Sequence, residues 1–214
     1  MRIDKGVIKA VDNASRAVVA EPDIDLRDYT CLPGLINTHV HFDANPEDAA
    51  DYGIYARRST RDNLELILQN AAITLKSGFT TVRHVGAWFP DAVATAKALI
   101  DEGLAQGPNI QTAGPYLTIP GGGGDLTFPE IPPEQIPAES QQGIASTPED
   151  FAQRAQTAID KGAQFLKVIA SGAVFSMGTA PGAPEMHQDD IAAVVAVAKK
   201  NGVKVTAHVH SDQS

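Results

Sequence analysis

Cysteine is nearly absent from this sequence. Cys31 is the single cysteine among 214 residues, so no disulfide can form within the chain. That scarcity fits a reducing compartment. The first residues, 1–11, include an early acid and lack the long apolar centre of a signal peptide. The sequence therefore predicts a cytoplasmic protein.

Two further absences exclude classes of partner. No apolar run reaches about 18 residues, which argues against a membrane-spanning helix. Lys and Arg total 17 against 26 Asp and Glu, and the basic residues are scattered, so a net charge of −9 offers no basic footprint for nucleic acid. We therefore expect a small-molecule substrate as partner, with no nucleic acid and no membrane.

What the chain does have is a regular alternation of strand and helix patterns. With 43% hydrophobic and 20% charged residues it can bury one sizeable core. Residues 6–20 predict two short strands around a turn at 12–14. Beyond them, short apolar runs predict strands, and apolar residues at helical spacing predict the helices between them. The predicted strands are 34–42, 79–86, 109–117, 164–172 and 203–210, and the predicted helices are 61–78, 91–107, 147–162 and 188–202.

This order predicts an α/β fold with a parallel sheet and crossover helices. The first strand is followed by no glycine fingerprint of a dinucleotide fold, so we expect a partial TIM (β/α) barrel with about five of its eight strands. Residues 1–32 are predicted to be a remnant of a small N-terminal β-domain, and residues 33–214 the partial barrel. An incomplete barrel has open edges, which a homo-oligomer would cover. A long loop at 118–146, containing Gly121 to Gly124, is expected to be functional or mobile.

Four of the six histidines form two pairs with the same spacing. His39 and His41 end the first barrel strand, and His208 and His210 end the last predicted one. Residues two apart in a strand share a face, and carboxyl ends of barrel strands build active sites. Converging imidazoles suit a divalent metal such as Zn²⁺. The alternative is that these are polar residues satisfied at strand ends.

Lys167 lies inside the apolar strand 164–172. Leu166 and Val168 are expected to face the helices, which turns Lys167 toward the barrel axis. A buried ammonium is costly unless it is paired or neutralised. Two interpretations remain open: an internal ion pair with an acid, or a lysine that reacts with carbon dioxide to form a carbamate able to bridge two cations.

In this order, the segments PGLINTHVHF (33–42), TTVRHVG (80–86), FLKVIASG (165–172) and AHVH (207–210) resemble the amidohydrolase superfamily. The resemblance covers about residues 31–210 and is to its imidazolonepropionase-like and Xaa-Pro-dipeptidase-like branch. It implies a metal-dependent hydrolase that cuts non-macrocyclic amide (C–N) bonds, in dipeptide-like or N-acyl amino acid substrates.

The resemblance also implies roles for individual residues. His39 and His41 would bind the more buried of two divalent metal ions, with zinc as the expected metal. Lys167, carbamylated, would bridge both ions, and His208 would bind the second. His210 would be a neighbouring or substrate-contacting catalytic group. The two ions would share a hydroxide that attacks the amide carbonyl.

Three features depart from the family pattern. Relatives carry a further metal-binding histidine after strand six and an aspartate after strand eight, and this chain ends at Ser214 before either. His84 stands where relatives have an acid, and is expected to be a core or substrate-loop residue. The loop reads Gly121 to Gly124 where relatives often have a histidine. The alternative function is therefore a non-catalytic fragment or pseudoenzyme.

Several other side chains keep two interpretations each. Asp43 would orient a metal ligand or be a solvated loop acid, and Trp88 would line a substrate pocket or pack in the core. Tyr116 ends the third barrel strand and would meet a substrate carboxylate. His187 is expected to cap a helix or lie in a loop, and Arg83 to face the helix layer in a salt bridge.

Overall fold

The computed structural model describes residues 1–5, 7–11, 28–129, 131–174, 176 and 178–212. They divide into two compact units, Met1–Pro33 and Gly34–Ser214. The division falls next to the predicted domain boundary. The origin of the first unit as a remnant of a small β-domain stays a prediction.

The first unit contains one antiparallel strand pair, β1 (Arg2–Asp4) and β2 (Val7–Ala10). Lys5 has a φ of 49°, in the left-handed region, where the chain reverses between them. The prediction placed β2 correctly but missed β1, because three residues are too few to show an alternating pattern. The predicted turn at 12–14 lies outside the described residues.

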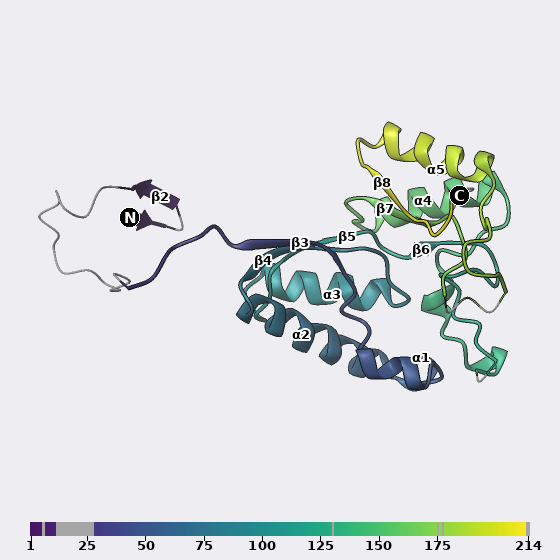
Figure 1. The fold of residues 1–214 in the computed structure, drawn as a ribbon, viewed down its shortest axis with the longest axis horizontal. Helices are drawn as coiled ribbons and strands as arrows, with labels where there is room; N and C mark the ends of the chain where they lie inside the picture. The colour runs from purple at the N-terminus through teal and green to yellow at the C-terminus, as the bar shows by residue number, and fades with distance from the viewer. Residues whose placement is uncertain (6, 12–27, 130, 175, 177, 213–214) are drawn as a thin grey trace, which may run out of the picture. The chain divides into compact units, whose positions relative to one another are not determined.

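The second unit is built on two parallel sheets of three strands each (Figure 1). The parallel pairing confirms the α/β prediction of crossover connections. No closed barrel forms among the described residues. The first sheet contains β3 (Leu35–Val40), β4 (Phe79–His84) and β5 (Asn109–Thr112), and the second contains β6 (Tyr116–Leu117), β7 (Leu166–Ile169) and β8 (Val205–His208).

One predicted strand, 109–117, is divided between the two sheets as β5 and β6. Gly114 has a φ of 72°, and Pro115 has no N–H to give to a ladder. Just before the break the chain bonds to neighbours of both sheets, from Ala113 N–H to the His84 carbonyl of β4 at 3.1 Å and from Gln164 N–H, which leads into β7, to the Thr112 carbonyl at 2.9 Å. The two sheets therefore meet where this strand is interrupted.

The helices that the sequence predicts are present. Helices α2 (Thr60–Lys76) and α3 (Pro90–Asp101) pack on the first sheet, and α4 (Pro148–Asp160) and α5 (Gln188–Lys200) pack on the second (Figure 1). No helix in the described part of the chain is long and apolar enough to cross a membrane. The prediction missed only short elements: α1 (Ile54–Arg57) and the 3-10 turns Pro46–Ala50, Pro133–Gln135 and Ala138–Gln141.

Two large apolar clusters form most of the core in the described residues, one behind each sheet, and Val85, Ala113 and Phe165 form a small third one. The cluster behind the second sheet joins α4 and α5 to Leu166 and Val168, as predicted for these two side chains. The cluster behind the first sheet takes in Trp88 together with Leu126 and Phe128 from the long loop. Burial of an apolar side chain of this size contributes about 1.5–3 kcal/mol. The loop at 118–146 is therefore packed into the core along part of its length.

Helix α4 begins with the cap that its sequence predicts. The Thr147 hydroxyl accepts a hydrogen bond from Asp150 N–H at 3.2 Å, and Pro148 occupies the first turn. We expect Thr147→Ala to cost about 1 kcal/mol and to lower the Tm by about 2–4 °C in calorimetry. Ser146→Ala, at an exposed neighbouring position, is the control and should leave the Tm unchanged. Equal effects of both changes would contradict the cap.

Candidate metal centre

The C-terminal half of β3 brings two imidazoles together. His39 and His41 point to one face of the strand, and their Nε2 atoms are 3.3 Å apart. Two nitrogens on one tetrahedral zinc, each at about 2.0–2.1 Å, are separated by about 3.3 Å. The Asn37 side chain accepts the His39 backbone N–H at 3.0 Å, which fixes the strand locally. The pair has the spacing that a single cation requires.

The loop that follows β4 orients His41 by contacting Nδ1, the ring nitrogen that faces away from His39. Its Nδ1 lies 3.1 Å from the Gly86 carbonyl oxygen, which can only accept, so Nδ1 carries the proton and donates it. Burial lowers the pKa of His41 and keeps the ring neutral. The Nε2 lone pair therefore faces His39. A backbone carbonyl on the far nitrogen is a common partner of metal-binding histidines.

Lys167 of β7 is buried among these histidines, with 2% of its surface exposed. Burial lowers the pKa of its ammonium to about 8. Its positive charge in turn lowers the pKa values of His39, His41 and His208, which shows its proximity to all three. No acid forms an ion pair with Lys167 in the part of the chain that the structure describes. The ion-pair interpretation therefore has no support among those residues.

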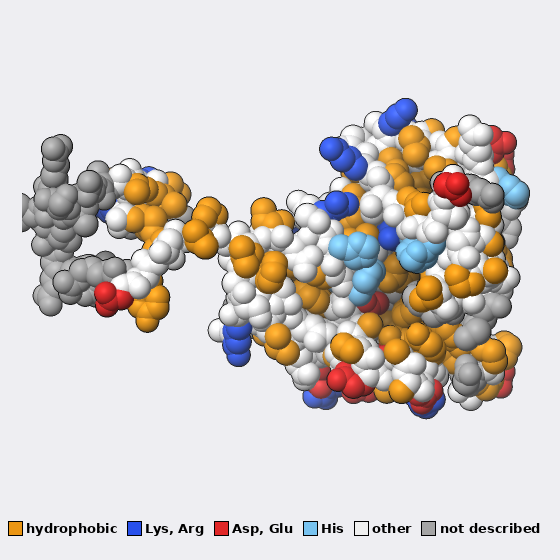
Figure 2. Space-filling view, viewed as in Figure 1, with side chains coloured by type: hydrophobic (Ala, Val, Ile, Leu, Met, Phe, Trp, Pro, Cys, Tyr) orange, Lys and Arg blue, Asp and Glu red, His pale blue; other side chains and the backbone are white. Residues whose placement is uncertain are grey.

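The second histidine pair lies at the end of β8. His208 Nε2 is buried and has no hydrogen-bond partner among the described residues, and burial is the main cause that lowers the pKa of His208 to about 4. His210 is exposed; its ring centre is 4.5 Å from that of His208, and its backbone N–H donates to the Ser171 hydroxyl at 2.9 Å. Figure 2 shows histidine side chains gathered on one face of the second unit, next to a basic side chain. His208 thus offers an uncommitted lone pair.

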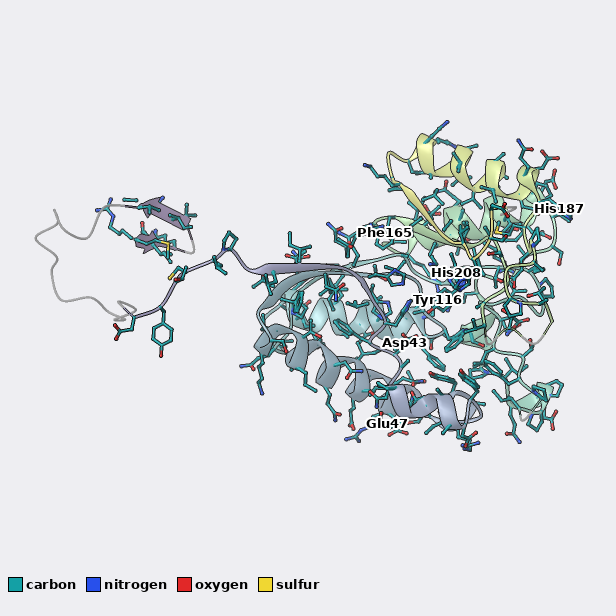
Figure 3. The ribbon with its side chains drawn as sticks, viewed as in Figure 1. Asp43, Glu47, Tyr116, Phe165, His187 and His208 are labelled. Carbon is teal, nitrogen blue, oxygen red and sulfur yellow. The ribbon has the colours of Figure 1, made fainter. Side chains whose placement is uncertain are left out.

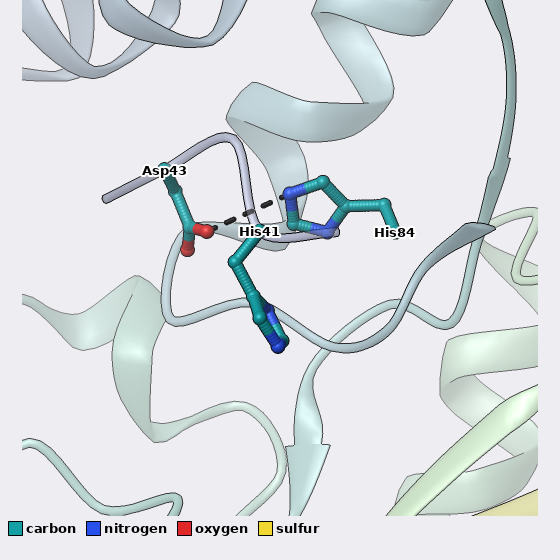
Figure 4. A group of neighbouring side chains, drawn as sticks. All are labelled: His41, Asp43 and His84. Carbon is teal, nitrogen blue, oxygen red and sulfur yellow. Dashed lines mark ion pairs between the residues drawn. The ribbon is translucent and has the colours of Figure 1, made fainter. Parts of the chain in front are cut away.

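A third cluster lies beside His41 and contains Asp43 and His84 (Figure 4). Their ligand atoms and that of His41 all lie within 4.8 Å of one another. His84 Nε2 accepts the Phe42 backbone N–H at 2.9 Å, and Asp43 Oδ2 accepts the Trp88 N–H at 3.2 Å. These bonds tie the end of β3 to β4, and they leave His84 Nε2 without a free lone pair for a metal.

His84 is neutral in this arrangement. An Nε2 atom that accepts a backbone N–H carries no proton, and complete burial lowers the pKa of His84 to about 4. Its 3.5 Å approach to Asp43 Oδ1, the dashed line in Figure 4, is therefore a contact of a carboxylate with a neutral ring. Asp43 and His84 therefore hold the strand ends in position, and of the three side chains in this cluster His41 is the one available to bind a metal.

The structure corrects two sequence interpretations here. Asp43 is 2% exposed, so the solvated-loop alternative is wrong. Arg83 does not face the helices: Val82 packs in the core there, and the Arg83 guanidinium lies 4.1 Å from the centre of the Phe165 ring. His84 is fully buried, as expected for a core residue, and it shares the buried face of β4 with Val82, so Arg83 between them points to the other face. Adjacent parallel strands bring residues 43 and 84 together, a signal available from the predicted strand order.

Two further candidates, Trp88 and His187, have structural roles outside the set of metal ligands. Trp88 is a core residue, since its Nε1–H donates to the Gly124 carbonyl at 3.0 Å and the ring is 7% exposed. His187 precedes α5, where its backbone N–H donates to Asp190, and Figure 3 shows it apart from Asp43, Tyr116 and His208.

Sequence reasoning missed Glu185, a buried carboxylate that anchors the glycine-rich loop. It accepts the Gly123 N–H at 2.9 and 3.0 Å and the Thr179 hydroxyl at 2.6 Å. A side chain at Gly122 would come within 2.5 Å of its Oε2 atom. The run of glycines therefore lets the loop close onto this carboxylate, and no periodic pattern marks such a contact in advance.

His84 makes folding dependent on pH. Its folded pKa of about 4 lies below the ordinary 6.5, so the unfolded chain binds the proton first and stability falls as the pH drops from 6.5 toward 4. The loss in the free energy of unfolding is on the order of 3 kcal/mol.

We expect His84→Gln, which keeps an acceptor for the Phe42 N–H, to flatten this pH dependence of stability in urea unfolding between pH 4 and 6.5. His84→Phe should be less stable than His84→Gln at pH 7 by about 1–3 kcal/mol, because Phe42 N–H loses its acceptor. An unchanged pH profile in His84→Gln would contradict the neutral assignment.

The chain is similar in sequence or in structure to several known proteins. The ochratoxinase of Aspergillus niger is 26% identical over 192 residues, which cover 84% of this chain and 39% of that protein. A crystal structure of a Xaa-Pro dipeptidase with bound methionine superposes with a TM-score of 0.77 at 31% identity, over 91% of this chain and 48% of that one. A prolidase complexed with N-methylphosphonate-L-proline gives a TM-score of 0.74 at 27% identity, over 89% and 47%.

The chain thus spans less than half the length of these relatives. The family model of the amidohydrolases matches residues 30–214, which include both histidine pairs, Lys167 and every strand of the second unit. On that match, the chain belongs to the amidohydrolase family.

Proposed function

We propose that this chain carries the metal-binding part of a metal-dependent hydrolase of amide (C–N) bonds. One observation carries the proposal: His39 and His41 have Nε2 atoms 3.3 Å apart, and Gly86 holds the opposite nitrogen of His41. Paired neutral imidazoles of this kind bind a borderline cation such as Zn²⁺. Membership in the amidohydrolase family supports the hydrolytic reaction class.

In this proposal the site holds two divalent ions, with zinc as the expected metal. His39 and His41 would bind one, and His208, with its unpartnered buried Nε2, would bind the other. Lys167 would connect them as a carbamate. The lysine nitrogen bonds to the carbon of carbon dioxide and releases one proton. Burial keeps the Lys167 pKa at about 8, so roughly one amine in ten is neutral at pH 7 and able to react.

Bound divalent ions would supply Lewis acidity, lowering the pKa of water and polarising the scissile carbonyl. The residues of this chain would position the metal ligands and the substrate. Gly86 orients His41, Asp43 and His84 fix the strand ends, and the buried Trp88 ring and the partly buried Tyr116 ring pack at one side of the centre. His210 is exposed beside His208 and would contact a substrate or the departing amine.

The proposed substrates are dipeptide-like compounds or N-acyl amino acids. The similarity to a Xaa-Pro dipeptidase and to an ochratoxinase supports this class. We further propose that the two sheets of the second unit, with β5 and β6 as parts of one interrupted strand, correspond to five strands of a (β/α)₈ barrel. A homo-oligomer is proposed to cover the open strand edges.

Direct metal binding tests the site. We expect the 214-residue chain to bind two Zn²⁺ ions in bicarbonate buffer, measured by calorimetric titration and metal analysis. His41→Ala should weaken binding by at least about 100-fold, because it removes a ligand. His187→Ala, remote from the centre, is the matched control. Equal affinities of wild type and His41→Ala, or no binding at all, would reject the proposal.

Lys167 allows a second test, which separates function from stability. Lys167→Met removes an unpaired buried ammonium, so we expect its metal-free Tm at pH 7 to rise by a few degrees. The same change should abolish the effect of bicarbonate on zinc stoichiometry. A lower Tm would mean that Lys167 has a stabilising partner, and zinc binding indifferent to bicarbonate in the wild type would argue against the carbamate.

A further inference from the structure

Tyr116 contacts His41 at the nitrogen that faces away from the metal centre. Its hydroxyl oxygen is 3.0 Å from His41 Nδ1, and the two ring centres are 5.9 Å apart. Tyr116 is paired in register with Lys167, and its ring also packs against Trp88. The tyrosine thus lies between the first histidine pair and the lysine strand.

Three glycines make room for this tyrosine: Gly86 follows β4, and Gly124 and Gly143 lie in the long loop at 118–146. A Cβ on Gly86 would lie 2.5 and 2.6 Å from two atoms of the Tyr116 ring. A Cβ on Gly124 would lie 2.6 Å from the Tyr116 Cβ, and one on Gly143 only 1.9 Å from its carbonyl oxygen. These distances are too short for any side chain, so the backbone of these two loops closes around Tyr116 and fixes its position.

The protons in this cluster have one consistent arrangement. The Gly86 carbonyl oxygen, 3.1 Å from His41 Nδ1, has no proton of its own, so Nδ1 must donate. A hydroxyl can accept as well as donate, and Tyr116 then shares the Nδ1–H as a second acceptor. The reverse arrangement, in which Tyr116 donates to Nδ1, would set two lone pairs against each other at Gly86 and place the proton on Nε2.

We propose that Tyr116 is a positioning residue that, together with the Gly86 carbonyl, holds His41 in the Nδ1–H tautomer and keeps Nε2 free for a cation. The inference rests on the proposed function for its purpose, because a cation is what would use that lone pair. The tautomer itself is a property of the metal-free chain, and it can be measured whether or not a metal binds.

Nitrogen NMR of the ¹⁵N-histidine-labelled full chain, without metal at pH 7.5, reads the tautomer directly. The His41 signals are assigned by their loss in His41→Asn. We expect His41 in the wild type to show a protonated Nδ1 and an unprotonated Nε2. Tyr116→Phe should populate the Nε2–H form several-fold more. Tyr55→Phe is the matched control, since it also removes a buried phenol hydroxyl but one that contacts Asp48.

A zinc titration completes the test. Tyr116→Phe should bind Zn²⁺ about tenfold more weakly than the wild type, and Tyr55→Phe should match the wild type. A wild-type His41 protonated at Nε2, or a tautomer ratio unchanged in Tyr116→Phe, overturns the role of Tyr116. If no zinc binds but the tautomer shifts as expected, the proposed function fails and the positioning role stands. If zinc binds equally to wild type and Tyr116→Phe with no tautomer change, the positioning role fails alone.

Discussion

The hydrogen bond from His41 Nδ1 to the Gly86 carbonyl is the interaction on which the centre depends. It joins the end of β3 to the loop after β4 and decides which nitrogen of His41 remains available. Gly86 makes this bond with a φ of 88°, a conformation that L side chains rarely adopt. The same glycine leaves space for Tyr116 and for the Lys167 stem. A single backbone position therefore sets the geometry of three side chains.

Around that bond the protein keeps several groups that reduce its stability. Lys167 is buried without a described acid, and His208 has a buried nitrogen without a described partner. Such groups cost free energy, and they concentrate where function requires them. The cost is offset by the apolar clusters behind the two sheets and by hydrogen bonds nearby, such as those that Glu185 accepts and the one from Phe42 N–H to His84 Nε2.

Much of the framework could be predicted from sequence because it follows local rules. Short apolar runs indicated the parallel strands, helical spacing indicated α2 to α5, and Thr147 with Pro148 marked the start of α4. Alternation along the strand placed Lys167 opposite Leu166 and Val168. The division of strand 109–117 was missed even though Gly114 and Pro115 are visible in the sequence, because the apolar pattern continues through them. The predicted orientation of Arg83 was wrong because alternation along a strand gives two faces without saying which one is buried.

By itself the sequence determined the ligand types and their order along the chain: an H-x-H pair, a lysine in a strand, and a second H-x-H pair. The covalent chain fixes this order, and the spacing within each H-x-H pair places both imidazoles on one face of a strand, since residues two apart in a strand share a face. Only the tertiary structure decided which nitrogen of His41 is free, that His84 is buried and neutral, and that two loops close around Tyr116. The hydrogen bonds behind the first two properties join residues 45 and 42 positions apart, so burial and hydrogen-bond partners depend on how the strands are packed.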